Sequence, residues 1–221
     1  MLGVGAVGAV LGGGEAQAAV IQWVAGIVIP ADIDGLYIKI DTQQTLAGAG
    51  AALPGWDLNP YSATSLTFFN ATGTGMMRYP GVTTGSAGSL DWGTEVGPAR
   101  SFGSGAVVVG SNPGNWSLNA INYIGFRFVA DGGGTHYGWA AIQVGSAITT
   151  RTFVSLNYES VASTPIFIGS LTSGAADPNP SAVPETSTVA AGALAGLALG
   201  ARFVVQRRRQ ATRRGSDLVQ A

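Results

Sequence analysis

YIGFRFVADGGGTHYGWAAIQV, residues 123–144, is the stretch that decides the fold. In its first part, Ile124, Phe126 and Phe128 share one face and Arg127 lies on the other, which is the alternation of a β-strand. A second apolar part follows DGGGT, and glycine supplies positive φ at little steric cost. The stretch therefore predicts one antiparallel hairpin closed by a glycine-rich turn.

Other short segments on both sides of this hairpin have the same strand character. Clusters of Gly, Pro, Asn and Ser separate them, and no stretch from Val20 to Leu171 has the 3.6-residue period of a helix. The sequence predicts an all-β domain over residues 20–171, a β-sandwich or jelly roll. The segments are LYIKID (36–41), SLTFFN (65–70), the buried-type run GAVVVG (105–110) and RTFVSLNYES (151–160). The residues predicted to share a face are Leu36, Ile38 and Ile40 in the first segment and Val154, Leu156 and Tyr158 in the last.

Composition and charge divide the chain into a body and a tail. The 221 residues allow one domain of about 150 residues with segments at each end. The absence of cysteine excludes a disulfide scaffold and a cysteine-based zinc site. Residues 19–184 carry nine acidic and five basic side chains, whereas residues 202–221 carry six arginines and one acid. An acidic body repels phosphates, so we expect no nucleic-acid partner.

The first 19 residues predict a signal peptide without its usual basic start. They are small and apolar, and the triplet Ala16–Ala18 fits the small-x-small rule of signal peptidase. Cleavage after Ala18 or Ala19 is expected. The same region matches the nucleotide-binding pattern GxGxxG, but no strand precedes it, so the signal peptide is the preferred interpretation. The glycines of that match are Gly3, Gly5 and Gly8.

The last fifty residues predict a membrane anchor in three parts. Residues 172–187 hold three prolines and form an exposed linker. Residues 188–206 are apolar, just long enough for a transmembrane helix, and Arg202 can extend to the interface. Residues 207–221 form a basic tail, which stays in the cytoplasm by the positive-inside rule. A buried core helix with a solvated tail is the alternative.

The tail VPETSTVAAGALAGLALGARFVVQRRR, residues 183–209, resembles the PEP-CTERM sorting signal of Gram-negative bacteria. That family has Val-Pro-Glu-Pro before a weak transmembrane helix and an arginine run. Thr186 departs from the second proline, and twelve residues follow Arg209. Residues 123–144 also resemble a stretch in the globular part of such proteins. The matching sorting motif is Val183, Pro184, Glu185 and Thr186, and the stop-transfer residues are Arg202, Arg207, Arg208 and Arg209.

This resemblance implies export, a membrane-bound precursor and processing. The partner would be an exosortase, an integral-membrane cysteine protease-transpeptidase, and the product would reach the cell surface or the extracellular matrix. Exopolysaccharide is a further candidate partner. The Leu-Pro-x-Thr-Gly signal of Gram-positive sortases is a second comparison: Pro184 and Thr186 match it, but its Leu and Gly are missing.

Side chains that could carry out catalysis form no recognisable constellation. Asp32 and Asp34 point the same way if their stretch is a strand, and they fit a solvated edge or a calcium-loop fragment better than a glycosidase pair. His136, expected in the hairpin turn, has no cysteine or second histidine to complete a metal site. No GxSxG nucleophile elbow is present. The sequence therefore predicts no catalytic residue, no metal site and no cofactor.

The tryptophans allow one further class of function. On an exposed sheet face, indole rings can stack on sugar rings. The preferred interpretation is that they pack in the core, as large aromatic side chains usually do. The sequence thus predicts a non-catalytic protein of the envelope or extracellular matrix; a carbohydrate-binding module, or less favourably a glycan-processing enzyme, on the same sorting tail is the alternative. The five tryptophans are Trp23, Trp56, Trp92, Trp116 and Trp139.

Overall fold

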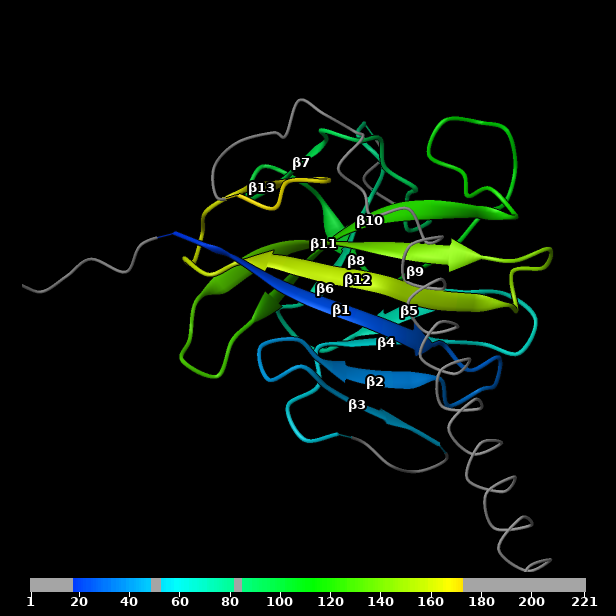
Figure 1. Ribbon diagram of the computed structural model, residues 1–221, viewed down its shortest axis with the longest axis horizontal. Coiled ribbons are helices and arrows are strands. Elements are labelled where there is room, and N and C mark those ends of the chain that lie inside the picture. Colours follow the sequence, from blue (N-terminus) through cyan, green and yellow to red (C-terminus); the bar gives the residue numbers. More distant parts are fainter. Residues whose placement is uncertain (1–17, 49–52, 82–84, 173–221) are drawn as a thin grey trace, which may run out of the picture. The chain divides into compact units, whose positions relative to one another are not determined.

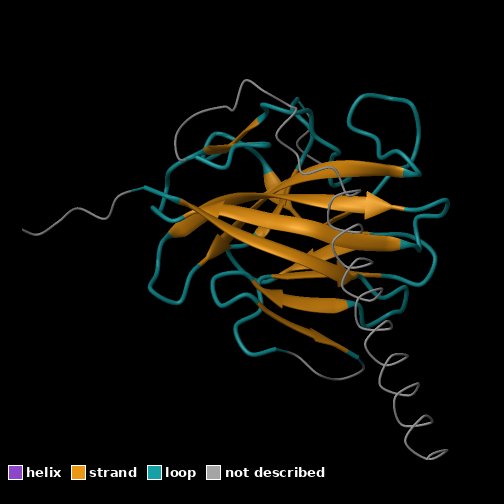
Figure 2. Cartoon of the chain, in the orientation of Figure 1, coloured by secondary structure: helices purple, strands orange, loops and turns teal. Residues whose placement is uncertain are grey.

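A computed structural model describes residues 18–48, 53–81 and 85–172, and these residues form an all-β body (Figures 1 and 2). The chain divides into two compact units, Met1–Pro178 and Asn179–Ala221, and all described residues belong to the first. Within the described residues there is no helix of the length and apolarity needed to cross a membrane. The predicted transmembrane helix, residues 188–206, lies outside them.

The strands of the described residues form three antiparallel sheets. The six-stranded sheet has the order β1-β12-β11-β10-β6-β8, the five-stranded sheet has the order β3-β2-β4-β5-β9, and β7 pairs with β13 alone. Figure 1 shows β1, β12, β11 and β10 side by side across the body. The strands are β1 (Val20–Val28), β2 (Leu36–Lys39), β3 (Gln44–Ala47), β4 (Leu58–Tyr61), β5 (Thr67–Asn70), β6 (Gly75–Met77), β7 (Glu95–Val96), β8 (Phe102–Gly103), β9 (Gly105–Ala106), β10 (Ala120–Val129), β11 (Thr135–Val144), β12 (Arg151–Glu159) and β13 (Ile166–Phe167).

The hairpin predicted from residues 123–144 is confirmed. Strands β10 and β11 pair from Ala120↔Val144 to Val129↔Thr135 without a shift in register. Gly133 and Gly134 have φ of 83° and 86°, so the turn uses the left-handed region that glycine tolerates. Inside the hairpin, Gly138 is also required for packing, because a Cβ there would lie 2.3 Å from the Phe126 ring.

The two larger sheets enclose one hydrophobic core, an arrangement consistent with a β-sandwich. As predicted, Ile124, Phe126 and Phe128 are fully buried in it, and so are the three predicted residues of the 36–41 segment. Full burial of a side chain of this size contributes about 1.5–3 kcal/mol to folding. The facing residues are Ile38, Leu58 and Phe68 from the five-stranded sheet and Phe126, Ile142 and Leu156 from the six-stranded sheet.

The predicted alternation in β12 is wrong at one position. Ala141 pairs with Ser155 and Ile142 with Phe153, so Val154 is an extra residue in a β-bulge. The bulge turns both Phe153 and Leu156 into the main core, and Val154 packs on the opposite face of the sheet. A uniform period of two cannot indicate such an insertion.

The run at 105–110 is also less buried than its composition predicted. The β9 strand ends at Ala106, and Val107 is buried, but Val108 and Val109 are 47% and 42% exposed. Val109 forms an isolated bridge with Trp116, and the Trp116 side chain is fully buried in the core. Its indole Nε1 donates a hydrogen bond of 3.1 Å to the Ala87 carbonyl.

A second hydrophobic cluster covers the outer face of β10 and β11. Tyr137 and Trp139 of β11 pack there against Val96 of β7 and Ile166 of β13. Arg127 also lies on this face, 5.1 Å from the centre of the Phe102 ring. Both faces of the central hairpin are therefore covered by protein.

Candidate functional site: an aromatic face

The outer face of the five-stranded sheet carries a group of aromatic side chains. Tyr37 of β2, Tyr61 of β4 and Phe69 of β5 lie on this face, because the residues that alternate with them fill the core. Trp56, which comes just before β4, lies beside them. We call Tyr37, Trp56, Tyr61 and Phe69 the aromatic face.

Ring contacts link three of these side chains. The centre of the Trp56 ring lies 5.3 Å from that of Tyr37, edge to face, and 5.8 Å from that of Phe69. Phe69 is 54% exposed, although phenylalanine is among the residues most often buried. The rings thus support one another and still leave apolar surface open to solvent.

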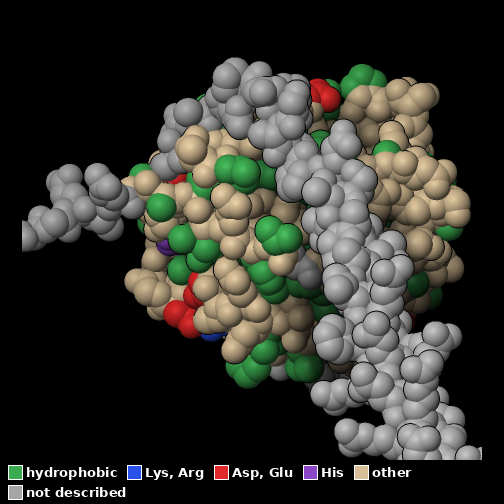
Figure 3. Space-filling model, viewed as in Figure 1, with side chains coloured by type: hydrophobic (Ala, Val, Ile, Leu, Met, Phe, Trp, Pro, Cys, Tyr) green, Lys and Arg blue, Asp and Glu red, His purple; other side chains and the backbone are tan. Residues whose placement is uncertain are grey.

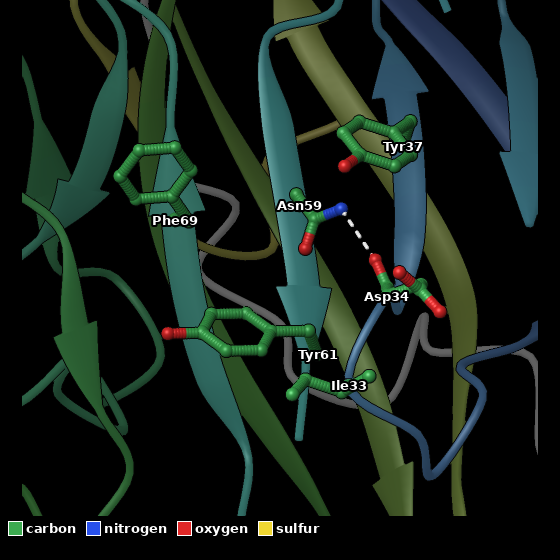
Figure 4. Close-up of a pocket in the computed structure, with 6 residues that line it drawn as sticks. All are labelled: Ile33, Asp34, Tyr37, Asn59, Tyr61 and Phe69. Carbon is green, nitrogen blue, oxygen red and sulfur yellow. Dashed lines mark hydrogen bonds between the residues drawn. The ribbon is translucent and has the colours of Figure 1, made fainter. Parts of the chain in front are cut away.

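A pocket of about 300 Å³ lies on the aromatic face and is lined by three of its four members. Figure 4 shows the rings of Tyr37, Tyr61 and Phe69 around the amide of Asn59. Ile33 and Asp34 complete the lining, and Ile33 is 80% exposed. Apolar walls with a few polar groups are typical of small-molecule sites.

The pocket has hydrogen-bond acceptors that remain available. Asn59 is 4% exposed, and its Nδ2 donates a bond of 2.9 Å to the backbone carbonyl of Asp34 (Figure 4). Its Oδ1 has no hydrogen-bond partner among the described residues. The Asp34 carboxylate likewise makes no hydrogen bond or ion pair with any residue the structure describes.

A tight loop holds Asp34 in place. The Asp32 carboxylate accepts hydrogen bonds from the backbone nitrogens of Asp34 (3.1 Å) and Gly35 (2.6 Å). Gly35 has φ of 67°, and a Cβ there would lie 2.3 Å from the Pro60 carbonyl oxygen. The two aspartates are therefore in a loop that packs on β4, and not in the strand that would have pointed both the same way.

Buried Arg151 ties this loop to the rest of the body. Its guanidinium donates hydrogen bonds of 2.7 Å to the carbonyls of Pro30 and Ser62, and it also bonds the carbonyl of Ser65. Burial lowers the pKa of Arg151, which the charge of Asp32 partly offsets. The terminal nitrogens of Arg151 thus fix the backbone before and after these segments, whereas its buried Nε has no hydrogen-bond partner among the described residues.

A second set of charged groups lies at the turn between β2 and β3. Lys39 forms an ion pair of 2.5 Å with Asp131, and Asp41 accepts a hydrogen bond of 2.9 Å from the Asp131 nitrogen. Buried Asp57 accepts a bond of 2.8 Å from the Ile40 nitrogen, and burial raises its pKa to about 6. The two contacts with Asp131 join the two larger sheets. The described residues contain no cluster of three or more His, Cys, Asp or Glu placed to hold a metal ion.

The structure places His136 in a strand and not in the turn. It pairs with Phe128 across the hairpin, and its ring stacks on the Phe128 ring at 5.4 Å. It is 8% exposed, and its Nδ1 lies 2.9 Å from the carbonyl oxygen of Glu159. The sequence suggested a turn because the glycine run ends only two residues earlier, but the strand begins at Thr135.

The tryptophans divide between core and surface. Trp116 and Trp139 are buried, and their indole nitrogens bond the carbonyls of Ala87 and Ser170. Trp23 and Trp92 are half-buried. Trp56 belongs to the aromatic face, whose tyrosine and phenylalanine members the sequence did not single out. Only the strand order brings them together, so a count of tryptophans could not have found them.

The predicted sorting motif, Val183 to Thr186, and the stop-transfer arginines lie outside the described residues. Comparison of the chain with protein-family models, curated proteins and solved structures gives no match.

Proposed function

We propose that the chain is an exported, non-catalytic protein of the bacterial envelope or extracellular matrix, sorted by an exosortase. The likeness of residues 183–209 to a PEP-CTERM signal supports this proposal. In it, residues 1–19 are removed on export, and residues 20–171 form a sandwich or jelly-roll body outside the cytoplasm. Residues 188–206 cross the inner membrane as a helix until processing, and residues 207–221 remain inside.

For the body we propose saccharide binding at the aromatic face. The observation that supports it is the set of linked, partly exposed rings around the free acceptor Oδ1 of Asn59. Sugar rings present apolar C–H faces and polar edges, so a platform of rings with nearby acceptors matches both. No catalytic step is required for this role.

The body's surface chemistry also suits a glycan more than a strongly anionic partner. Figure 3 shows hydrophobic side chains scattered among other side chains and backbone on the face in view, with few charged groups. Charged residues make up 10% of the chain, against about 25% in typical proteins. Ligand binding at a surface of this kind depends on ring contacts and on hydrogen bonds between uncharged groups.

Binding to polysaccharides tests the proposal directly. We expect the full chain, purified in a detergent without a sugar headgroup, to be retarded in gels that contain at least one neutral or amino polysaccharide. Tyr37→Ala combined with Phe69→Ala should weaken this binding about tenfold or more, because two stacking surfaces are lost. Val24→Ala is the matched control, since Val24 is 74% exposed on β1 of the other sheet.

Unchanged binding by the double variant would exclude the aromatic face as the binding site. Thermal unfolding of the parent and of each variant is measured alongside the gels to show that the variants are folded. Because Phe69 is largely exposed, its loss should change stability little, so lost binding by a folded variant reports on the site.

A further inference from the structure

We infer that the saccharide bound at the aromatic face carries a free amino group at the unit over Asp34, and that uronic-acid polymers are rejected. This inference rests on the proposed saccharide binding and specifies its chemistry. Asp34 lies in the pocket wall, half-buried, and its carboxylate has no hydrogen bond or ion pair among the described residues. A partly desolvated carboxylate without a partner favours a cationic donor.

Among the described residues, no basic side chain lines the pocket to neutralise this carboxylate. Lys39, on the same face of β2, is already paired with Asp131 at 2.5 Å. The charge of Asp32 affects the pKa of Arg151. Arg151 is buried, however, and its guanidinium donates hydrogen bonds to backbone carbonyls.

The Asn59 amide also requires a donor from the ligand, whereas the hydroxyls of Tyr37 and Tyr61 in the lining can donate or accept. Asn59 uses its Nδ2 on the Asp34 carbonyl and leaves only the acceptor Oδ1 open. Asp32, next to Asp34, adds a second negative charge to the loop. An ammonium group offers three donors and one positive charge, whereas a uronate carboxylate offers acceptors only and would meet like charge. The pocket is therefore complementary to an amino sugar.

A series of oligosaccharides that differ only at C2 tests this complementarity. The probes are β-1,4-linked oligomers of glucose, N-acetylglucosamine and glucosamine of equal length, with an oligouronate as the anionic probe. Titration calorimetry uses the full chain at mildly acidic pH, where the amino groups of the glucosamine oligomer are protonated. We expect the cationic glucosamine oligomer to bind about tenfold more tightly than the two neutral probes, and the oligouronate not to bind.

Substitution of the carboxylate separates its role from that of overall charge. Asp34→Asn should remove the preference for glucosamine and leave the affinity for the glucose oligomer within about twofold, because the rings remain. Asp91→Asn is the control: it removes the same charge from an exposed site away from the pocket and should keep the preference. Added salt should reduce the preference in the parent protein.

Each alternative result overturns a different statement. Equal affinity for the glucose and glucosamine oligomers overturns the amino-sugar inference and leaves saccharide binding intact. A preference that persists in Asp34→Asn shows attraction by the acidic body as a whole and overturns the role of Asp34. Failure of every probe to bind the parent protein, together with failure in the polysaccharide gels, overturns saccharide binding itself.

Discussion

At the scale of single residues, buried Asp57 makes stability depend on pH. Burial, assisted by the nearby charge of Asp41, raises its pKa to about 6, against about 3.9 in an unfolded chain. The folded state therefore binds the proton more tightly. The stabilising contribution is present below the unfolded pKa and is lost as the pH rises through about 6.

Asp57→Asn should remove this dependence. Asparagine can still accept the hydrogen bond from the Ile40 nitrogen, which spans 2.8 Å to the aspartate oxygen, but it carries no charge. At about pH 7.5 we expect the variant to be more stable than the parent by on the order of 1–2 kcal/mol, and at about pH 4 the two should be nearly equal. Urea unfolding at both pH values measures this. A difference that is the same at both values would show that Asp57 is not protonated near pH 6 in the folded protein.

At the scale of elements, β10 separates two hydrophobic clusters, and its residues test that division. Phe126 and Phe128 are fully buried in the main core, whereas Arg127 lies half-buried over Phe102 on the opposite face. Phe126→Ala and Phe128→Ala should each destabilise the body by about 3–5 kcal/mol. Arg127→Ala should cost about 1 kcal/mol, from lost packing and cation–π contact. Denaturant unfolding measures the free energy of unfolding of the three variants. An equal loss of stability at all three positions would contradict the two-cluster arrangement.

Elements also show what the sequence could and could not predict. The β10–β11 hairpin follows from local information, because alternation fixes its faces and the glycines fix its turn. The bulge at Val154 does not, since it depends on how β12 fits β11 and β1 at once. The aromatic face was missed for the same reason: Tyr37, Tyr61 and Phe69 come from three strands whose neighbourhood is set by the sheet order.

At the scale of the whole molecule, the proposed function needs a body that binds and a tail that delivers it. In our proposal, residues 183–209 are the sorting signal that directs the body to its destination. Pro184 fixes its own φ and disfavours helix at Val183, so the motif should enter an enzyme cleft in extended form. Glu185 carries the only charge between Asp177 and Arg202, which makes it a natural contact for a cationic group or backbone donors of a membrane enzyme.

Glu185→Ala should therefore leave folding and export intact and block processing. In a Gram-negative host with an exosortase, we expect the variant to accumulate as a full-length, membrane-bound precursor, because the sorting enzyme no longer recognises it. Thr186→Pro, which introduces the residue usual in PEP-CTERM signals, is the matched control and should be processed at least as well as the parent. Immunoblots of membrane and medium fractions distinguish the two forms.

If Glu185 only capped a helix, its loss would cost about 1 kcal/mol and sorting would continue. Release of a shortened Ala variant would thus leave the apolar segment and the arginines as the sole support for sorting.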